Sequence, residues 1–220
     1  GTLSSLPDWE ANIIGNAFGV AFGDMNNDGR PDLAVATGWS YDYYYYKDYV
    51  YVNVDGSLEA TASWASDGTS ICQGALWVDG DDDGWLDLVV VAYDDYSRIY
   101  RNLGGMLETT ASWQTADNSH QDAIMAATGD VTGDGIVDLF LTDNTQLGGS
   151  GRFRQYTGLE DDLFENSYSW SYYEGYGSAV AVADIDNDGL LDLATGGWWE
   201  PARLFLNLSL IHISEPTRPY

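Results

Sequence analysis

Basic residues are scarce in this sequence. Eight Lys and Arg stand against 35 Asp and Glu, Lys47 is the only lysine, and the formal net charge is -27. Clustered Lys and Arg are needed to bind phosphate, so this composition excludes nucleic acid and anionic membrane surfaces as expected partners. No apolar run is long enough to span a bilayer, and we expect no membrane insertion.

Residues that carry catalytic chemistry are equally scarce. Cys72 is the only cysteine, which excludes intrachain disulfides and any Cys-based zinc site. The two histidines are His120 and His212, and the sequence has neither a Gly-x-Ser-x-Gly elbow nor a glycine-rich phosphate loop. We therefore expect this segment not to be an enzyme. A two-carboxylate glycosidase stays open as an alternative, because spacing in sequence does not reveal spacing in space.

Aspartate is abundant, with 27 Asp against 8 Glu, and much of it belongs to a repeat. The four copies are DMNNDGRPDL from Asp24, DGDDDGWLDL from Asp79, DVTGDGIVDL from Asp130 and DIDNDGLLDL from Asp184, at intervals of 55, 51 and 54 residues. A small-residue and apolar run precedes each copy, and a short apolar run follows it. A third segment and a Gly turn come next, and three of the copies continue into a segment that ends in Ser-Trp, at Trp64, Trp113 and Trp170.

Four short β-rich runs in about 50 residues are typical of one β-propeller blade. We predict an all-β β-propeller of four-stranded antiparallel blades within residues 1–207, with about four blades at 15–64, 74–113, 123–170 and 177–207. Trp9 precedes Asp24 by the same 15 residues that separate Trp64 from Asp79. Residues 1–9 are therefore expected to be the last strand of a preceding blade, which either closes the ring or marks an arc cut from a larger ring.

The C-terminal residues 208–220 do not follow the repeat. Residues 208–218, LSLIHISEPTR, resemble the in-frame translation of a transposase adapter used in sequencing libraries. We interpret 208–220 as a non-native scar rather than a natural C-terminal strand, and we expect the natural protein to continue beyond Asn207.

The Asp-rich segments predict calcium loops. Oxygen side chains at positions 1, 3 and 5 converge on one point, Gly at position 6 permits a sharp turn, position 7 offers its carbonyl and position 9 returns a carboxylate. The predicted ligands are Asp24, Asn26, Asp28, Arg30 and Asp32; Asp79, Asp81, Asp83, Trp85 and Asp87; Asp130, Thr132, Asp134, Ile136 and Asp138; and Asp184, Asp186, Asp188, Leu190 and Asp192. One Ca²⁺ per repeat gives about four ions. The alternative is that each Asp-Gly only makes a hairpin turn.

These loops are not EF-hands, which need Glu at position 12 and a helix on each side. Position 12 is Val35, Val90, Leu141 or Thr195, and the flanking segments are strand-like. The chain instead resembles the FG-GAP or VCBS-type repeats of integrin-α-like β-propellers, and the first copy retains Phe22-Gly23 before Asp24.

This resemblance implies one calcium ion in the hairpin between the first two strands of each blade, and an extracellular or cell-surface location. It also implies about seven blades in the intact propeller, which makes this chain part of a larger one.

The loops opposite the calcium loops collect aromatic residues. Exposed rings mixed with Asp and Asn suit a glycan-binding or protein-binding surface. The candidate ligand-binding residues are Trp39, Tyr41, Tyr93, Tyr96, Trp198 and Trp199. The alternative is that these rings pack between blades.

Two functions follow from these patterns. The first is a calcium-stabilised module for adhesion or for recognition of a glycan or protein ligand. The second is the non-catalytic propeller of a larger secreted enzyme, such as a polysaccharide-degrading one, with other modules of the parent chain as its partners.

Overall fold

The computed structural model describes residues 1–12, 15–38, 46–93, 95–116 and 122–208. All regular structure in this part of the chain is β, and every strand pair is antiparallel. None of these residues belongs to a helix that could cross a bilayer.

Four successive sheets form the blades, and the prediction of an all-β propeller is confirmed. Blade 1 has the order β1 (Ala17–Gly23), β2 (Asp32–Thr37), β3 (Tyr49–Tyr51) and β6 (Trp64–Ala65). Blade 2 has β7 (Ile71–Val78), β8 (Asp87–Tyr93), β9 (Arg98–Tyr100) and β10 (Trp113–Gln114). Blade 3 has β11 (Ala126–Gly129), β12 (Asp138–Leu141), β13 (Arg152–Tyr156) and β16 (Trp170–Tyr173). Blade 4 has β17 (Gly177–Ala183), β18 (Asp192–Gly197) and β19 (Glu200–Phe205).

Small outer hairpins follow the third strand in two blades. They are β4 (Asn53–Val54) with β5 (Ser57–Leu58), and β14 (Gly158–Leu159) with β15 (Asp162–Phe164). Because the chain first turns through this outer segment, it returns to pair with the third strand only from the Trp onward. The fourth strands therefore start at Trp64, Trp113 and Trp170, where the repeat pattern predicted that they would end.

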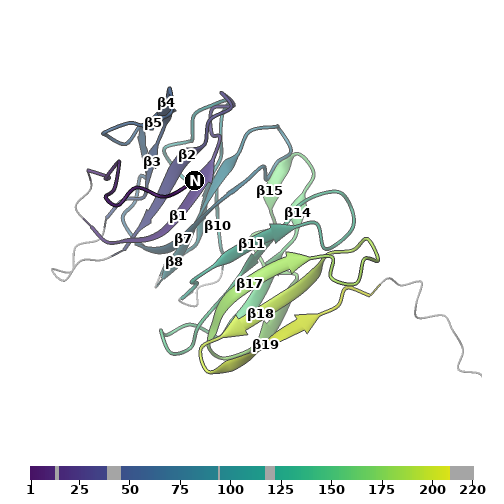
Figure 1. Ribbon diagram of the computed structural model, residues 1–220. Helices are drawn as coiled ribbons and strands as arrows, with labels where there is room; N and C mark the ends of the chain where they lie inside the picture. The colour runs from purple at the N-terminus through teal and green to yellow at the C-terminus, as the bar shows by residue number, and fades with distance from the viewer. Residues whose placement is uncertain (13–14, 39–45, 94, 117–121, 209–220) are drawn as a thin grey trace, which may run out of the picture.

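The blades follow one another around an arc, with blade 1 and blade 4 at its two ends (Figure 1). The first strands of consecutive blades lie next to each other, β1 beside β7, β7 beside β11 and β11 beside β17. Apolar cores fill the space between neighbours, and the second strands β2, β8 and β12 are buried almost throughout. On the outer face of blade 1, Trp9 and Ala11 pack against Leu33, Val35 and Tyr51.

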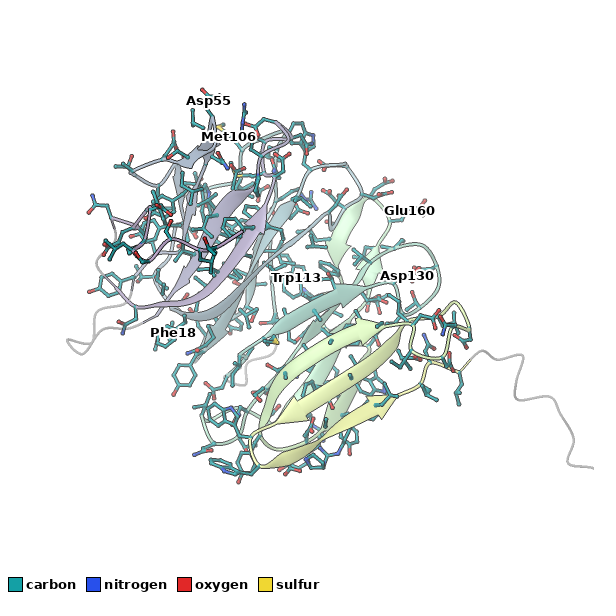
Figure 2. All side chains as sticks on the ribbon, in the orientation of Figure 1. Phe18, Asp55, Met106, Trp113, Asp130 and Glu160 are labelled. Carbon is teal, nitrogen blue, oxygen red and sulfur yellow. The ribbon has the colours of Figure 1, made fainter. Side chains whose placement is uncertain are left out.

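A tryptophan seals each junction between blades. Trp64, Trp113 and Trp170 place their rings edge-on against Tyr100, Tyr156 and Phe205 of the next blade, at centroid distances of 4.7, 5.4 and 5.6 Å. Figure 2 shows Trp113 between the sheets in the middle of the molecule. The Nε1–H groups of Trp64 and Trp113 also donate to the carbonyls of Glu108 and Phe164 in the outer segment of the next blade.

Trp9 makes the same contact with blade 1. Its ring lies 4.9 Å from that of Tyr51, and its Nε1–H donates to the Glu59 carbonyl. Residues 1–12 form no strand, although 1–9 were expected to be one. A strand needs a hydrogen-bonded neighbour, and among the described residues no backbone hydrogen bond joins residues 1–9 to another segment.

Candidate metal centre

The four predicted calcium loops connect the first and second strands of the blades. Their shape comes from two left-handed residues in each loop. Position 6 is always glycine, with φ between 84° and 91° at Gly29, Gly84, Gly135 and Gly189. Position 4 is Asn27, Asp82, Gly133 or Asn187, with φ between 54° and 76°. Asn, Asp and Gly are the residues that tolerate this conformation, which explains their place in the sequence.

The position-1 carboxylate closes each loop. Asp79 accepts the backbone N–H of Asp83 at 3.1 Å and that of Gly84 at 3.0 Å. Asp24, Asp130 and Asp184 bind the same two amides of their own loops. Position 5 in turn accepts the amide of position 7, as from Asp83 to Trp85 at 2.8 Å. The loops are therefore folded around their own carboxylates, which fixes the directions of the remaining oxygen lone pairs.

Two loops bring three carboxylates together. One oxygen from each of Asp79, Asp81 and Asp83 lies within 4.8 Å of the others, and the same holds for Asp184, Asp186 and Asp188. Hard oxygen donors at this density suit Ca²⁺. The first loop has the amide of Asn26 and the third the hydroxyl of Thr132 in the corresponding place, so each has one carboxylate fewer.

The position-9 aspartates lie below the loops and bind the sheet. Asp32, Asp87, Asp138 and Asp192 are all buried, and each accepts an N–H from position 2 and another from the end of the third strand. In blade 2 these donors are Gly80 at 3.0 Å and Asn102 at 2.8 Å. In the structure these carboxylates act as staples that join three strands, and their predicted role as calcium ligands stays a prediction.

Burial disfavours the ionised form of the position-9 carboxylates. It raises the pKa of Asp87 to about 7, although the two backbone N–H groups that Asp87 accepts lower this pKa. The negative charges of Asp81 and Asp83 raise it further. The pKa values of Asp32 and Asp138 are raised too, again chiefly by burial. A divalent cation nearby favours ionised carboxylates, so the staples and a bound cation would support each other.

Arginines reach four of the loop or outer-hairpin acids. Arg30 pairs with Asp28 at 3.3 Å and with Asp55 at 3.2 Å, and Arg101 pairs with Asp81 at 3.1 Å and with Asp162 at 2.6 Å. Figure 2 shows Asp55 at the tip of the outer hairpin of blade 1. Within the described residues no Lys or Arg pairs with Asp184, Asp186 or Asp188. That triad is therefore the one whose mutual repulsion is least relieved by the protein.

The sequence analysis did not predict a role for the Asn residues that follow the third strands, Asn102 and Asn207. Asn102 Nδ2 donates to the Leu86 carbonyl and, at 2.8 Å, to the Met25 carbonyl in the calcium loop of blade 1. Asn207 likewise reaches the carbonyls of Leu191 and, in blade 3, Val131. The signal was present in the sequence, since the third segments YVYVN, RIYRN and RLFLN share a final Asn.

The aromatic candidates fall into separate groups. Trp198 and Trp199 occupy the β18–β19 turn, where Trp199 lies 6.2 Å from Trp198 and 5.9 Å from Tyr176 between ring centroids. Tyr93 and Tyr96 belong to blade 2, at the end of β8 and before β9. Trp39 and Tyr41 lie outside the described residues.

Comparison with known proteins agrees with the fold. A solved structure titled as BBS1N in complex with ARL6DN, soaked with mercury, matches with a TM-score of 0.56 and 13% identity over 85% of this chain and 53% of that one. A lead-soaked form of the same complex matches with a TM-score of 0.47 and 14% identity, covering 87% and 55%. The chain thus spans about half the length of these structures, and the likeness concerns the fold alone. No curated protein matches significantly.

Family models match the repeats directly. The model described as FG-GAP-like repeat matches residues 79–141 and 130–195, and the one described as FG-GAP repeat matches residues 16–53. The FG-GAP-like matches alone cover more than half of the chain, and all matches include the Asp-rich loops between first and second strands. The chain belongs to the FG-GAP repeat family of β-propellers.

Proposed function

We propose that this propeller is an extracellular calcium-binding module that recognises a protein or glycan ligand. The observation that carries the proposal is the pair of carboxylate triads, Asp79, Asp81 and Asp83 in blade 2 and Asp184, Asp186 and Asp188 in blade 4. Three carboxylates within 4.8 Å repel one another strongly unless a cation lies between them. Extracellular fluids supply calcium at concentrations that fill sites of modest affinity.

The residues fit calcium to different degrees. In blades 2 and 4, oxygens of positions 1, 3 and 5 and the carbonyl of position 7 would hold the ion. Blades 1 and 3 would replace one carboxylate by Asn26 or Thr132, which keeps the oxygen but removes a charge. Because calcium affinity follows the number of charged ligands, we propose that the loops of blades 2 and 4 bind most tightly. Arg101 competes with the ion for Asp81, which leaves the blade 4 loop as the tightest site.

Calcium titration by calorimetry tests this assignment. The unmodified chain is expected to bind about four ions, with dissociation constants of about 10⁻⁴–10⁻³ M. Asp186→Asn removes the central charge of the blade 4 triad and is expected to weaken the tightest site at least tenfold, while leaving the sites of blades 1 and 2 unchanged.

The matched control is Asp161→Asn, an exposed acid in the β14–β15 turn whose φ of 59° Asn accepts readily. It is expected to titrate like the unmodified chain. A flat calorimetric trace with millimolar calcium, or equal losses in the two variants, would remove the calcium assignment.

The opposite end of the blades supports the ligand-binding part of the proposal. Trp199 is 80% exposed, and its φ of 59° is uncommon for a bulky residue. The fold therefore keeps a large apolar ring in water in a strained conformation, an arrangement that is common in functional turns. Together with Trp198 and Tyr176 it offers stacking surface for a sugar ring or an apolar side chain.

A glycan array tests this end. Trp199→Gly removes the ring and relieves the backbone strain, so we expect the variant to lose array binding while its melting temperature stays equal or rises by a few degrees. Met106→Ala is the control, because Met106 is 74% exposed on the outer segment of blade 2, at the calcium end. Array binding that survives in Trp199→Gly would show that this turn does not contact the ligand.

A second candidate function is a non-catalytic scaffold within a larger secreted enzyme. The observation that favours it is the exposure of apolar side chains at both ends of the arc, such as Phe22 on β1 at 67% and Leu204 on β19 at 52%. Such surfaces serve as interfaces with other modules. In either case the proposed role of this segment is binding, not catalysis.

A further inference from the structure

Three aromatic side chains come together between blades 3 and 4, at the end of the blades opposite the calcium loops. Tyr176 lies on the segment that connects the two blades, and Trp198 and Trp199 form the β18–β19 turn. The Trp199 ring is inclined by 76° to that of Trp198 and by 89° to that of Tyr176, at centroid distances of 6.2 and 5.9 Å. Nearly perpendicular rings form a corner, and we call these three residues the aromatic corner.

Backbone contacts from both blades hold the aromatic corner in place. The N–H of Trp198 in blade 4 donates to the Tyr176 carbonyl at 2.9 Å. From blade 3, the N–H of Thr145 donates to the Gly175 carbonyl at 2.8 Å, and Asn144 forms an isolated β-bridge with Tyr176. A site that is assembled before the ligand arrives loses little conformational entropy on binding. The corner is therefore preorganised by the two blades between which it lies.

The angles between the rings suit a compact ligand better than a flat one. A sugar ring that stacks on one aromatic face contacts a perpendicular neighbour only with its rim. A roughly spherical group can contact the faces of two perpendicular rings at once. Trp199 is 80% exposed and Trp198 is 40% exposed, so ring surface is open to such a group. The face of an aromatic ring attracts a cation that lies within about 6 Å of its centre, and Trp attracts it most strongly.

The charges beside the aromatic corner also favour a cation. Glu174 lies two residues before Tyr176, and Glu200 follows Trp199 directly. Arg203 pairs with both carboxylates and leaves one of the two negative charges uncompensated. Glu174 is buried, and its Oε2 has no hydrogen-bond partner among the described residues. The formal net charge of -27 attracts cations to the whole molecule and repels anions from it.

We propose that the aromatic corner binds a trimethylammonium group. This group is compact and positively charged, and its methyl groups hold water weakly, so that they contact ring faces directly. The tryptophans supply the faces, and the carboxylates beside them supply the balancing charge. Choline headgroups and trimethylated lysine side chains both carry this group. The site rests on the ligand-binding role proposed above for this end of the blades and gives that ligand its chemistry.

Choline is the first probe, and saturation-transfer NMR on its methyl protons over a concentration series measures the binding. The control ligand is 3,3-dimethyl-1-butanol, which has nearly the same shape with carbon in place of the charged nitrogen. Choline is expected to bind at least about tenfold more tightly, because attraction to the ring faces needs the charge. Equal binding of the two ligands, or no binding of choline, would overturn the proposal.

Trp199→Leu keeps an apolar side chain in the turn but removes the aromatic face. It is expected to weaken choline binding about tenfold or more. Calcium titration of this variant is expected to stay unchanged, because the calcium loops lie at the other end of the blades, and this checks that the variant is folded. Tyr168→Leu is the matched control, since Tyr168 is 41% exposed in blade 3 and lies outside the corner. Choline binding that survives in Trp199→Leu, or that both variants lose equally, contradicts the site.

Two further ligands distinguish the carriers of the trimethylammonium group. Phosphocholine represents a choline headgroup, and N-acetyl-Nε-trimethyllysine amide represents a modified protein. The uncompensated acid beside the corner repels phosphate, so the trimethyllysine ligand is expected to bind more tightly. Tighter binding of phosphocholine would keep the site and assign it to a choline headgroup.

The glycan array separates this site from the proposed function. Array binding that depends on Trp199, in a chain that does not bind choline, would overturn the trimethylammonium site and leave the proposed glycan recognition standing. Choline binding that depends on Trp199, without any array binding, would support the site and remove the glycan as its ligand.

Discussion

Removing calcium with EGTA is expected to lower the melting temperature of the chain by about 10–20 °C. At a tenfold excess of calcium over the dissociation constant, each occupied site adds about 1.4 kcal/mol to the free energy of unfolding, so four sites add about 5 kcal/mol. For a domain of this size each kcal/mol moves the melting temperature by roughly 2–4 °C. The repulsion within the triads of blades 2 and 4 adds to the loss once the ions leave.

Differential scanning calorimetry of the same sample with EGTA, and then with excess calcium restored, measures this shift. Magnesium at equal concentration is the control, because Mg²⁺ demands a tight octahedral shell and sheds its water reluctantly. It is expected to restore less of the lost stability. A melting temperature that does not respond to EGTA would mean that the loops are stable without metal and that their aspartates only make turns.

Asp87→Ala is expected to destabilise blade 2 by about 2–6 kcal/mol. The substitution strands the N–H groups of Gly80 and Asn102, which are buried at the junction of three strands, and each stranded donor costs about 1–3 kcal/mol. Relief of the buried negative charge, whose pKa burial raises to about 7, offsets part of this cost. Asp87→Asn keeps one acceptor oxygen and is expected to lose about half as much.

Urea unfolding in EGTA separates this role from calcium binding. Asp81→Ala is the matched control, because Asp81 belongs to the blade 2 triad and forms an ion pair with Arg101. Without calcium, removing this carboxylate relieves its repulsion with Asp79 and Asp83. We expect Asp81→Ala to stay within about 1 kcal/mol of the unmodified chain under these conditions. If both variants unfold alike, the position-9 carboxylate is not a staple.

The blades and the loops were predictable because both follow from local rules. Gly at position 6 and Asn, Asp or Gly at position 4 define the loop from within ten residues. The role of Asp87 was not predictable in the same way. Its second donor is the backbone N–H of Asn102, which comes next to Asp87 only when the third strand β9 pairs with β8. The start of the fourth strand at Trp64 likewise depends on how far the outer hairpin carries the chain before it returns.

The candidate ligand face was harder to predict for a related reason. The position of the loops in the repeat predicted at which end of the blades the aromatic residues lie, but not which of their rings contact one another. The ring of Trp199 contacts those of Trp198 and Tyr176, because the β18–β19 turn of blade 4 packs against the segment that connects blade 3 to blade 4. Tyr93 and Tyr96 belong to the sheet of blade 2. Ring contacts between segments 20 or more residues apart depend on blade geometry, which no single repeat contains.

The asparagine amides that cross between blades connect neighbouring ion sites energetically. Asn102 holds the Met25 carbonyl, which lies between two proposed ligands of the first loop, and Asn207 does the same for Val131 in the third. Linkage is reciprocal. An ion that orders one loop therefore also stabilises the neighbouring blade whose Asn side chain binds that loop, and so raises the calcium affinity of that blade's own loop. Blade 3 has Gly158 at the corresponding place, with no side-chain amide to reach blade 2. Cooperativity is therefore expected within two couples, blades 1 and 2 and blades 3 and 4, so that the array fills as two units rather than as four.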